Sequence, residues 1–239
     1  FPTRRSSDLV WKQANRYKVP RIIFVNKLDR MGADFFKVVD SINDKLRGNV
    51  VPMQLPIGES ENFSGIVDLM TMKYVSFNEK EVSLDVVWQE IPAEFAERAE
   101  QLRAKMVEKI CEQDDVLSER FINGEDISNE DLKRVLRQGV INRTITPAFC
   151  GSAFKNKGVQ LLLDAIVDYL PSPLDVPPVE GLLDDGSTVL CHADPKEPFA
   201  GLVFKIVTDP FGVLSFIRIY SGVLKSGSYV MNVNRGTKD

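Results

Sequence analysis

The chain has 239 residues, of which 44% are apolar, enough for one large folded domain or two ordinary ones. Its 30 Lys and Arg residues against 34 Asp and Glu residues give a net charge of -4, which excludes a global basic field that would attract nucleic acid. The three cysteines include no C-x-x-C pair, and no apolar run reaches the length of about 18 residues that crosses a bilayer. This argues against a disulfide framework, a zinc site and membrane insertion, and favours a reducing cytosol.

The amino-terminal segment predicts a helix and then a strand. A helical apolar pattern begins at Val10 and ends near Lys18, whereas residues 1–9 (FPTRRSSDL) do not share it. We interpret residues 1–9 as a foreign leader, such as a translated sequencing adapter, with an ordinary flexible terminus as the alternative. Pro20 closes the helix, and the run RIIFV after it is rich in β-branched and aromatic residues, which predicts a buried strand ending at Asn26.

The middle of the chain predicts a mixture of helices and short strands. Residues 32–46 carry apolar side chains at helical spacing, with Gly48 and Asn49 as stop signals, which predicts a helix beside the first strand, as in an open parallel sheet. Short apolar stretches broken by Pro, Gly, Ser and Asn predict small strands over residues 50–77. The pattern then predicts helices at about 92–113 and 128–139, a buried strand in TPAFC (146–150) and a helix over 159–170.

The carboxy-terminal part predicts a second domain. Residues 171–198 are rich in proline, which indicates a semi-rigid linker and a domain boundary. Residues 199–239 contain β-rich runs separated by Pro-Phe-Gly and Lys-Ser-Gly turns, a pattern typical of an antiparallel barrel or sandwich. Since the pattern shows only about three strands and a small barrel commonly needs five or six, we expect the start of a barrel that is cut within the domain.

The loop Asn26-Lys27-Leu28-Asp29 after the first strand has the chemistry of a guanine reader. Loops at the carboxyl ends of strands are where open α/β sheets bind nucleotides. A carboxylate at Asp29 accepts hydrogen bonds from both N1-H and the exocyclic amine of guanine, and adenine offers no matching pair of donors. The Lys27 stem suits one face of the base, and the Asn26 amide suits a tie between neighbouring loops. Alone, N-K-x-D is weak, because it also arises by chance at surface turns.

A second loop strengthens this interpretation. Cys150, Gly151, Ser152 and Ala153 follow the strand-like TPAF, and small residues let backbone N-H groups approach an acceptor such as guanine O6. Two loops that follow two buried strands would then converge on one base.

Other reactive side chains have ordinary structural interpretations. His192, the only histidine, is expected to be an exposed loop residue in the proline-rich segment. Cys150 is expected to be small and buried rather than nucleophilic, since no histidine is near it in sequence. Lys155 and Lys157 are expected to be solvated, and Phe204 is expected in the barrel core.

The stretches FVNKLDRMGADF and CGSAFKNKGVQLLLDAIVDYLPSPLDVP resemble the elongation factor G family of bacterial translational GTPases. The resemblance covers nearly all of the chain after residues 1–9. It implies a cytoplasmic, monomeric protein that binds GTP or GDP with Mg²⁺ and hydrolyses GTP to drive ribosomal translocation. It assigns Asn26, Lys27 and Asp29 to the guanine-specificity loop, and Ser152 with Ala153 to a second base-contacting loop.

The resemblance also implies an inserted subdomain. The two loops are separated by far more chain than one strand-helix crossover requires, and the family's insertion would occupy about residues 54–142. The family assigns it contacts with ribosomal stalk proteins, and its members also contact ribosomal RNA; elongation factor Tu lacks this insertion and is the poorer match. The expected fold class is α/β: an incomplete P-loop GTPase-type parallel sheet with an inserted α+β subdomain in residues 10–170, followed by the start of an antiparallel β-barrel.

The phosphate-binding motifs of this family are missing from the sequence. It has no G-x-x-x-x-G-K-[ST] loop, and no switch threonine or D-x-x-G segment ahead of the N-K-x-D loop. We therefore expect a fragment that keeps the guanine-reading loops, lacks the Mg²⁺ ligands and does not hydrolyse GTP. Two alternatives stay open: a related peptide-release or ribosomal-protection GTPase, and a non-catalytic ribosome-binding or interaction fragment. Unpaired sheet edges would also allow most of the fold to fail.

Overall fold

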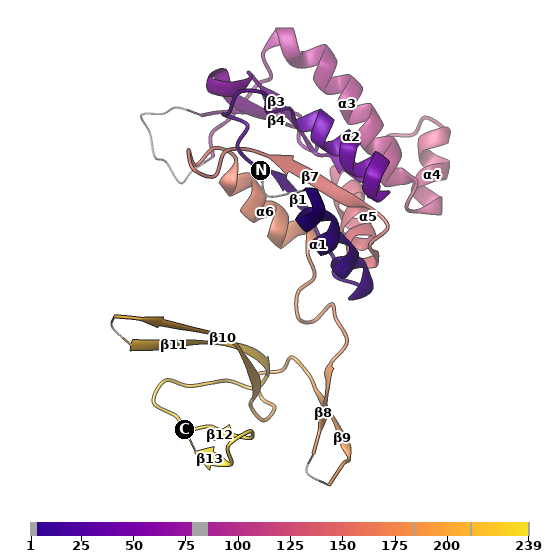
Figure 1. Ribbon diagram of the computed structural model, residues 1–239. Coiled ribbons are helices and arrows are strands. Elements are labelled where there is room, and N and C mark those ends of the chain that lie inside the picture. The colour runs from indigo at the N-terminus through magenta and orange to yellow at the C-terminus, as the bar shows by residue number, and fades with distance from the viewer. Residues whose placement is uncertain (1–3, 78–85, 184, 211, 239) are drawn as a thin grey trace. The chain divides into compact units, whose positions relative to one another are not determined.

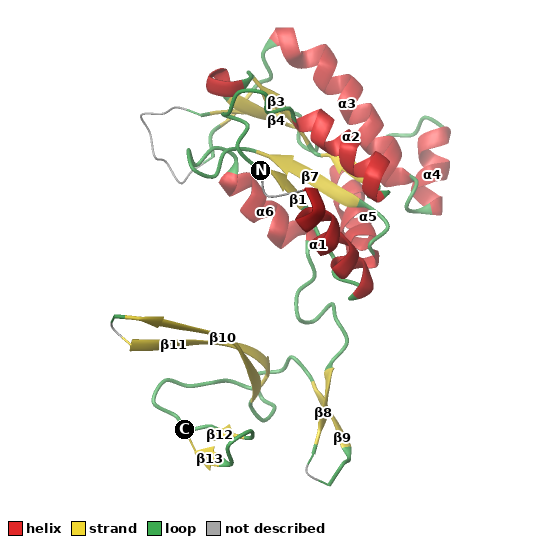
Figure 2. Ribbon diagram, viewed as in Figure 1, coloured by secondary structure: helices red, strands yellow, loops and turns green. Residues whose placement is uncertain are grey.

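The computed structural model describes residues 4–77, 86–183, 185–210 and 212–238. The chain divides into two compact units, Phe1–Leu170 and Pro171–Asp239. All helices in the part of the chain described belong to the first unit, and the second contains strands and loops (Figures 1 and 2). The units meet in sequence where the proline-rich composition predicts a domain boundary.

The first unit contains both helices and strands. Its helices are α1 (Arg4–Arg16), α2 (Phe35–Leu46), α3 (Ala93–Cys111), α4 (Asp115–Ile122), α5 (Asn129–Asn142) and α6 (Val159–Tyr169), with a short 3-10 helix η1 (Ser60–Asn62). Its strands are β1 (Ile23–Val25), β2 (Val50–Pro52), β3 (Gln54–Ile57), β4 (Gly65–Asp68), β5 (Lys73–Ser76), β6 (Trp88–Gln89) and β7 (Thr146–Cys150). The predicted α/β class is confirmed.

Three details of the first unit differ from the sequence-based expectations. Helix α1 begins at Arg4, inside the segment interpreted as a leader, and residues 1–3 of that segment lie outside the described part. The short helix α4 was not predicted; it is capped by Asp114, whose carboxylate accepts a hydrogen bond from Leu117 N at 3.0 Å. Strand β6 is only two residues long, too short to leave a periodic pattern.

The parallel sheet has three strands in the order β1-β7-β2. Its central strand β7 is buried along its whole length, and successive side chains point to opposite faces. Phe149 joins the core cluster that includes Ala165 and Tyr169 of α6, whereas Ala148 and Cys150 join the cluster that includes Phe35 and Val39 of α2. Figure 1 shows the same arrangement, with α6 and α2 on opposite sides of β7. The predicted strand, helix and parallel sheet therefore form the centre of the first unit.

Helix α2 ends before the glycine expected to stop it. Its C-cap is Arg47, which takes the left-handed conformation with φ of 50°. Gly48 serves a steric role instead, because a Cβ there would lie 2.9 Å from methyl groups of both Ile42 and Val50. The expected stop signal is thus a point of close packing between α2 and β2.

The elements from β3 to α5 occupy Gln54–Asn142, the range in which an inserted subdomain is expected. Strands β3-β4-β5-β6 form a four-stranded antiparallel sheet, and residues 78–85 of the range lie outside the described part. Helices α3, α4 and α5 follow β6 along the chain. Buried side chains from β3, β4 and these helices share one core cluster with Phe149 of β7, so this segment packs directly against the parallel sheet.

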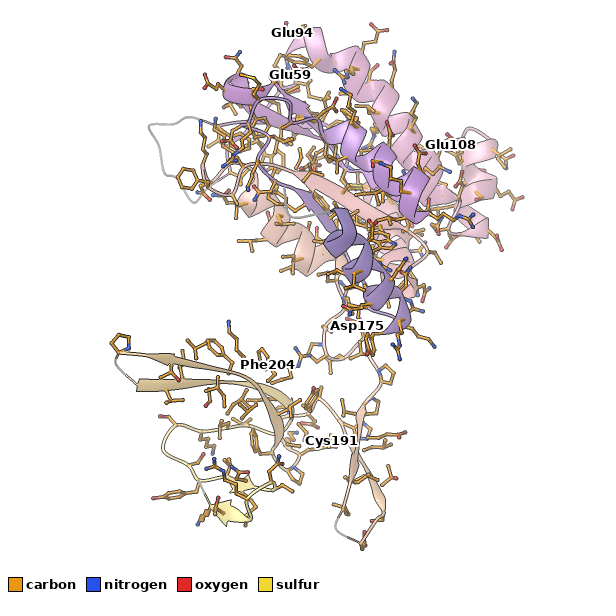
Figure 3. All side chains as sticks on the ribbon, viewed as in Figure 1. Glu59, Glu94, Glu108, Asp175, Cys191 and Phe204 are labelled. Carbon is orange, nitrogen blue, oxygen red and sulfur yellow. The ribbon has the colours of Figure 1, made fainter. Side chains whose placement is uncertain are left out.

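The second unit is built of antiparallel hairpins. Its strands are β8 (Val179–Leu182), β9 (Thr188–Cys191), β10 (Ala200–Asp209), β11 (Gly212–Ser221), β12 (Met231–Asn232) and β13 (Thr237–Lys238). The hairpin β8-β9 lies within residues 171–198, so the predicted linker contains regular structure that its prolines concealed. The expectation that Phe204 is a core residue is wrong in this structure: it projects from the β10-β11 ribbon and is 64% exposed (Figure 3).

The outer edge of β2 is closed by a side chain. Asn43 of α2 accepts a hydrogen bond from Val50 N at 2.7 Å and donates one to Val50 O at 3.1 Å, which imitates a neighbouring strand. Pro52 ends the same strand and has no N-H to leave unpaired. The edge therefore offers few free backbone groups to another chain.

Replacing Asn43 by Ala removes both partners of Val50 and should lower the free energy of unfolding by about 1–3 kcal/mol. Urea unfolding monitored by circular dichroism measures this change. Asp44→Ala, at an exposed position of the same helix, is the control and should change stability by no more than about 0.5 kcal/mol. Equal effects of the two substitutions would contradict the role given to Asn43.

Candidate functional site

The two loops singled out by the sequence begin side by side at one edge of the parallel sheet. Val25 of β1 is in register with Cys150 of β7, so both strands end at the same level. Gly151 N donates to Val25 O at 3.1 Å, and Leu28 N donates to Gly151 O at 3.1 Å. The structure thus brings the N-K-x-D loop and the Gly-Ser-Ala loop together, at the carboxyl edge where open α/β sheets bind ligands.

Asn26 joins the two loops through its side-chain oxygen. Oδ1 accepts hydrogen bonds from Lys27 N at 2.8 Å and from Ala153 N at 2.9 Å, across 127 positions of sequence in the second case. The predicted tie between neighbouring loops is therefore present. Because Ala153 N-H is already bonded, it is not free in this structure to serve guanine O6, as the sequence suggested.

The other backbone donors of the second loop are also engaged up to Phe154. Ser152 N donates to Lys157 O at 2.9 Å. Phe154 follows Ala153 and is 97% exposed, and its N-H makes no hydrogen bond to the part of the chain described. Sequence reasoning missed this donor because a backbone N-H leaves no signal in residue type. It is the first group of the loop available to a base carbonyl.

Asp29 and Ser152 face each other across the junction of the loops. The Ser152 hydroxyl is the main cause that lowers the pKa of the Asp29 carboxyl, and the positive charges of Lys155 and Arg30 act in the same direction, against a smaller effect of burial. Ser152 Oγ is buried, yet its geometry forms no regular hydrogen bond with Asp29 or any other described group. The junction therefore holds an ionised carboxylate beside an unsatisfied hydroxyl.

Lys27 has a left-handed backbone, with φ of 66°. A non-glycine residue in this region carries backbone strain, which local hydrogen bonds must offset. Lys27 N binds Asn26 Oδ1, and Lys27 O accepts from Arg30 N at 3.1 Å. Its side chain is exposed.

The expectations for Cys150, His192 and Lys155 are confirmed, and the one for Lys157 is wrong. Cys150 is buried, and burial raises the pKa of its thiol, which makes it a poor nucleophile. His192 is exposed in the second unit. Lys155 is exposed as expected, but Lys157 is only 5% exposed, because its ammonium donates to the carbonyl of Phe63 at 2.8 Å inside the first unit.

Comparison with known proteins identifies the family of this chain. The family model for the elongation factor Tu GTP binding domain matches residues 4–172. The crystal structure of ttk003000868 from Thermus thermophilus matches with a TM-score of 0.70 and 28% sequence identity, over 94% of this chain and 31% of that one. The chain thus spans less than a third of the length of that protein.

The fold and the paired loops define a guanine-nucleotide-binding domain of the translational GTPase class. The chain belongs to the elongation factor Tu GTP-binding domain family. The family match begins at residue 4, within the segment interpreted as a leader, and ends next to the boundary between the two units.

Neither a metal cluster nor a membrane span occurs in the described part of the chain. Within residues 4–77, 86–183, 185–210 and 212–238, no three His, Cys, Asp or Glu side chains are grouped to hold a metal ion. None of the helices described is long and apolar enough to span a membrane.

Hydrogen exchange of the Ala153 amide tests the bridge made by Asn26. Asn26→Ala removes the acceptor of the Ala153 N-H and should speed hydrogen exchange at that amide by about tenfold or more, because the two loops lose their shortest tie. Asn26→Asp keeps an oxygen at the Oδ1 position and should preserve most of the protection. Exchange measured by NMR, residue by residue, distinguishes the variants; equal protection of Ala153 in all three proteins would exclude the bridge.

Proposed function

We propose that the junction of the two loops binds the guanine base of GTP or GDP, and that the chain is the guanine-reading part of an elongation factor G-type protein. The observation that carries this proposal is the junction itself, where Gly151 N bonds to Val25 O and Ala153 N bonds to Asn26 Oδ1, so that both loops meet at the end of β1 that leads into Asp29. The loop residues assigned to the base are Asn26, Lys27, Asp29, Ser152 and Ala153.

Each of these residues has a defined task. Asp29 accepts hydrogen bonds from the N1-H and exocyclic amine of guanine, a donor pair that adenine lacks. The Lys27 stem covers one face of the ring. Asn26 and Ala153 hold the loops in place through their mutual hydrogen bond, and the exposed N-H of Phe154 is the donor available to O6. A buried Ser152 hydroxyl without a partner gains one when the carboxylate settles against the base.

The wider activity is proposed for a longer protein. In that proposal GTP hydrolysis, with Mg²⁺ bound outside this chain, drives translocation on the ribosome in the cytoplasm, and the protein acts as a monomer. The segment from β3 to α5 would contact ribosomal stalk proteins, and other surfaces would contact ribosomal RNA. None of the residues described here is assigned to Mg²⁺, and no step is derived through it.

Two alternatives share the same loops. A peptide-release or ribosomal-protection GTPase would differ in domains outside this chain. A non-catalytic ribosome-binding or interaction fragment is favoured for the 239 residues themselves by their lack of a G-x-x-x-x-G-K-[ST] loop. The insertion-sized segment between the loops and the GVQLLLDAIVDYLPSP stretch support the elongation factor G type.

Exchanging the acceptor at Asp29 should exchange the base that is bound. Asp29→Asn places an amide donor where the carboxylate stood, so guanosine binding should fall about tenfold or more while xanthosine, which has a carbonyl in place of the amine, should bind better than to wild type. Because the pKa of Asp29 is lowered, wild-type guanosine binding should stay constant from neutral pH down to about pH 5 and be lost only as the carboxyl protonates. NMR titration measures both. Asp40→Asn, on an exposed part of α2, is the control and should bind both nucleosides as the wild type does. If Asp29→Asn keeps the wild-type preference for guanosine over xanthosine, the site is refuted.

The 239-residue chain should release no phosphate from GTP above the buffer rate, since catalysis of phosphoryl transfer depends on the phosphate loop and metal contacts that its sequence lacks. A phosphate-release assay on protein freed of contaminating GTPases measures this. Calorimetry should show that GTP binds no more tightly than guanosine, with or without Mg²⁺. Turnover that follows the chain through purification, or tight Mg²⁺-dependent GTP binding, would contradict the proposal.

A further inference from the structure

The second base loop is anchored by groups that lie outside its own strand and helix. Gln54 Oε1 accepts a hydrogen bond from Cys150 N at 2.9 Å, just before the loop begins. Lys157 Nζ, at the end of the loop, donates to Phe63 O at 2.8 Å. Gln54 and Phe63 both belong to the segment from β3 to α5, and the paired residues are 96 and 94 positions apart in sequence. The segment therefore holds the loop at both ends.

Both anchors are buried, which is unusual for these residue types. Gln54 is 0% exposed and Lys157 is 5% exposed. The Lys157 ammonium also lies 5.9 Å from the centroid of the Phe63 ring, within cation-π range. Burying an ammonium gives little net stability, because desolvation opposes the gain from its contacts. Such a group instead fixes the position of its chain segment, because its short charge-assisted hydrogen bond is directed at one carbonyl.

The anchor at Lys157 is connected to the base site by rigid backbone contacts. Ser152 N donates to Lys157 O and Lys157 N donates to Ser152 O, both at 2.9 Å. A Cβ on Gly151 would lie 2.3 Å from Lys157 O, so the two sides of the loop touch without free space. A shift of the Lys157 backbone is therefore passed directly to Ser152, whose hydroxyl is the main cause that lowers the pKa of the Asp29 carboxyl.

We propose that Gln54 and Lys157 are positioning residues for guanine recognition, through which the segment from β3 to α5 sets the second base loop against Asp29. Neither side chain touches the base; each acts through the backbone of Cys150 or Ser152. A partner that displaced Phe63 or β3 would thereby change how tightly and how selectively the base is held. This inference rests on the guanine-binding function proposed above.

The test replaces each anchor by methionine, which keeps a flexible side chain of similar length and removes the hydrogen bond. In Lys157→Met and in Gln54→Met, exchange of the Ala153 amide without nucleotide should accelerate about tenfold, and guanosine affinity should fall by a similar factor. Gln54→Glu keeps an acceptor for Cys150 N and should bind guanosine better than Gln54→Met. Lys105→Met makes the same chemical change at an exposed position of α3 and should leave every quantity unchanged.

A comparison of guanosine with inosine separates positioning from stability. Inosine lacks the exocyclic amine, so a misplaced loop should shrink the preference for guanosine, whereas partial unfolding lowers the affinity for both nucleosides in the same proportion. Unchanged amide exchange and unchanged preference in folded Lys157→Met and Gln54→Met would overturn the inference. If one variant does not fold, the other decides by the same measurements. A wild-type chain without guanosine preference would refute the proposed function, while exchange measured without nucleotide would still decide whether the anchors order the loop.

Discussion

The site depends on the parallel pairing of β1 with β7. That pairing places Val25 and Cys150 at the same level, and every contact between the loops starts there. The hydrogen bonds from Gly151 N to Val25 O and from Leu28 N to Gly151 O continue the pairing beyond the strands. One step further along, Ala153 N donates to the side-chain oxygen of Asn26, where a backbone carbonyl would accept in a regular strand pair. The two loops are thus an extension of the sheet rather than independent surface turns.

This extension of the sheet is possible because glycines let the backbone segments of the loop approach each other closely. At Gly151 a Cβ would meet the Lys157 carbonyl and the Phe24 ring, and at Gly158, with φ of 79°, it would meet the Cys150 carbonyl at 2.7 Å. Glycine is needed at both points because the backbone of the loop folds onto itself and onto β1. Polar groups buried in such a packed region must be bonded or be ready to bond. The buried Ser152 hydroxyl, like Nε2 of Gln54, has no hydrogen-bond partner among the described residues, which supports the ligand site proposed for this junction.

The elements that could be predicted are those whose local sequence carries the whole signal. The strand of RIIFV, the helix after it and the helix capped by Ser128 were predicted because apolar period and capping residues are adjacent in sequence, and Ser128 does accept from Asp131 N at 3.1 Å. Helix α4 was not predicted because Leu117 is its one buried residue, and a single apolar position does not make a periodic pattern. The β8-β9 hairpin was not predicted because the prolines around it gave the segment the composition of a linker.

For the proposed site, the sequence by itself determined which side chains have groups suited to guanine: the acceptor at Asp29, the amide at Asn26 and the small residues of the second loop. The sequence is sufficient for this because the hydrogen-bond donors and acceptors of a side chain follow from its residue type. The tertiary structure alone decided which backbone donors are already used, that Lys157 is buried, and that Gln54 reaches Cys150 N. These facts arise from contacts between residues some 90 or more positions apart, where position in space, not residue type, sets the partner.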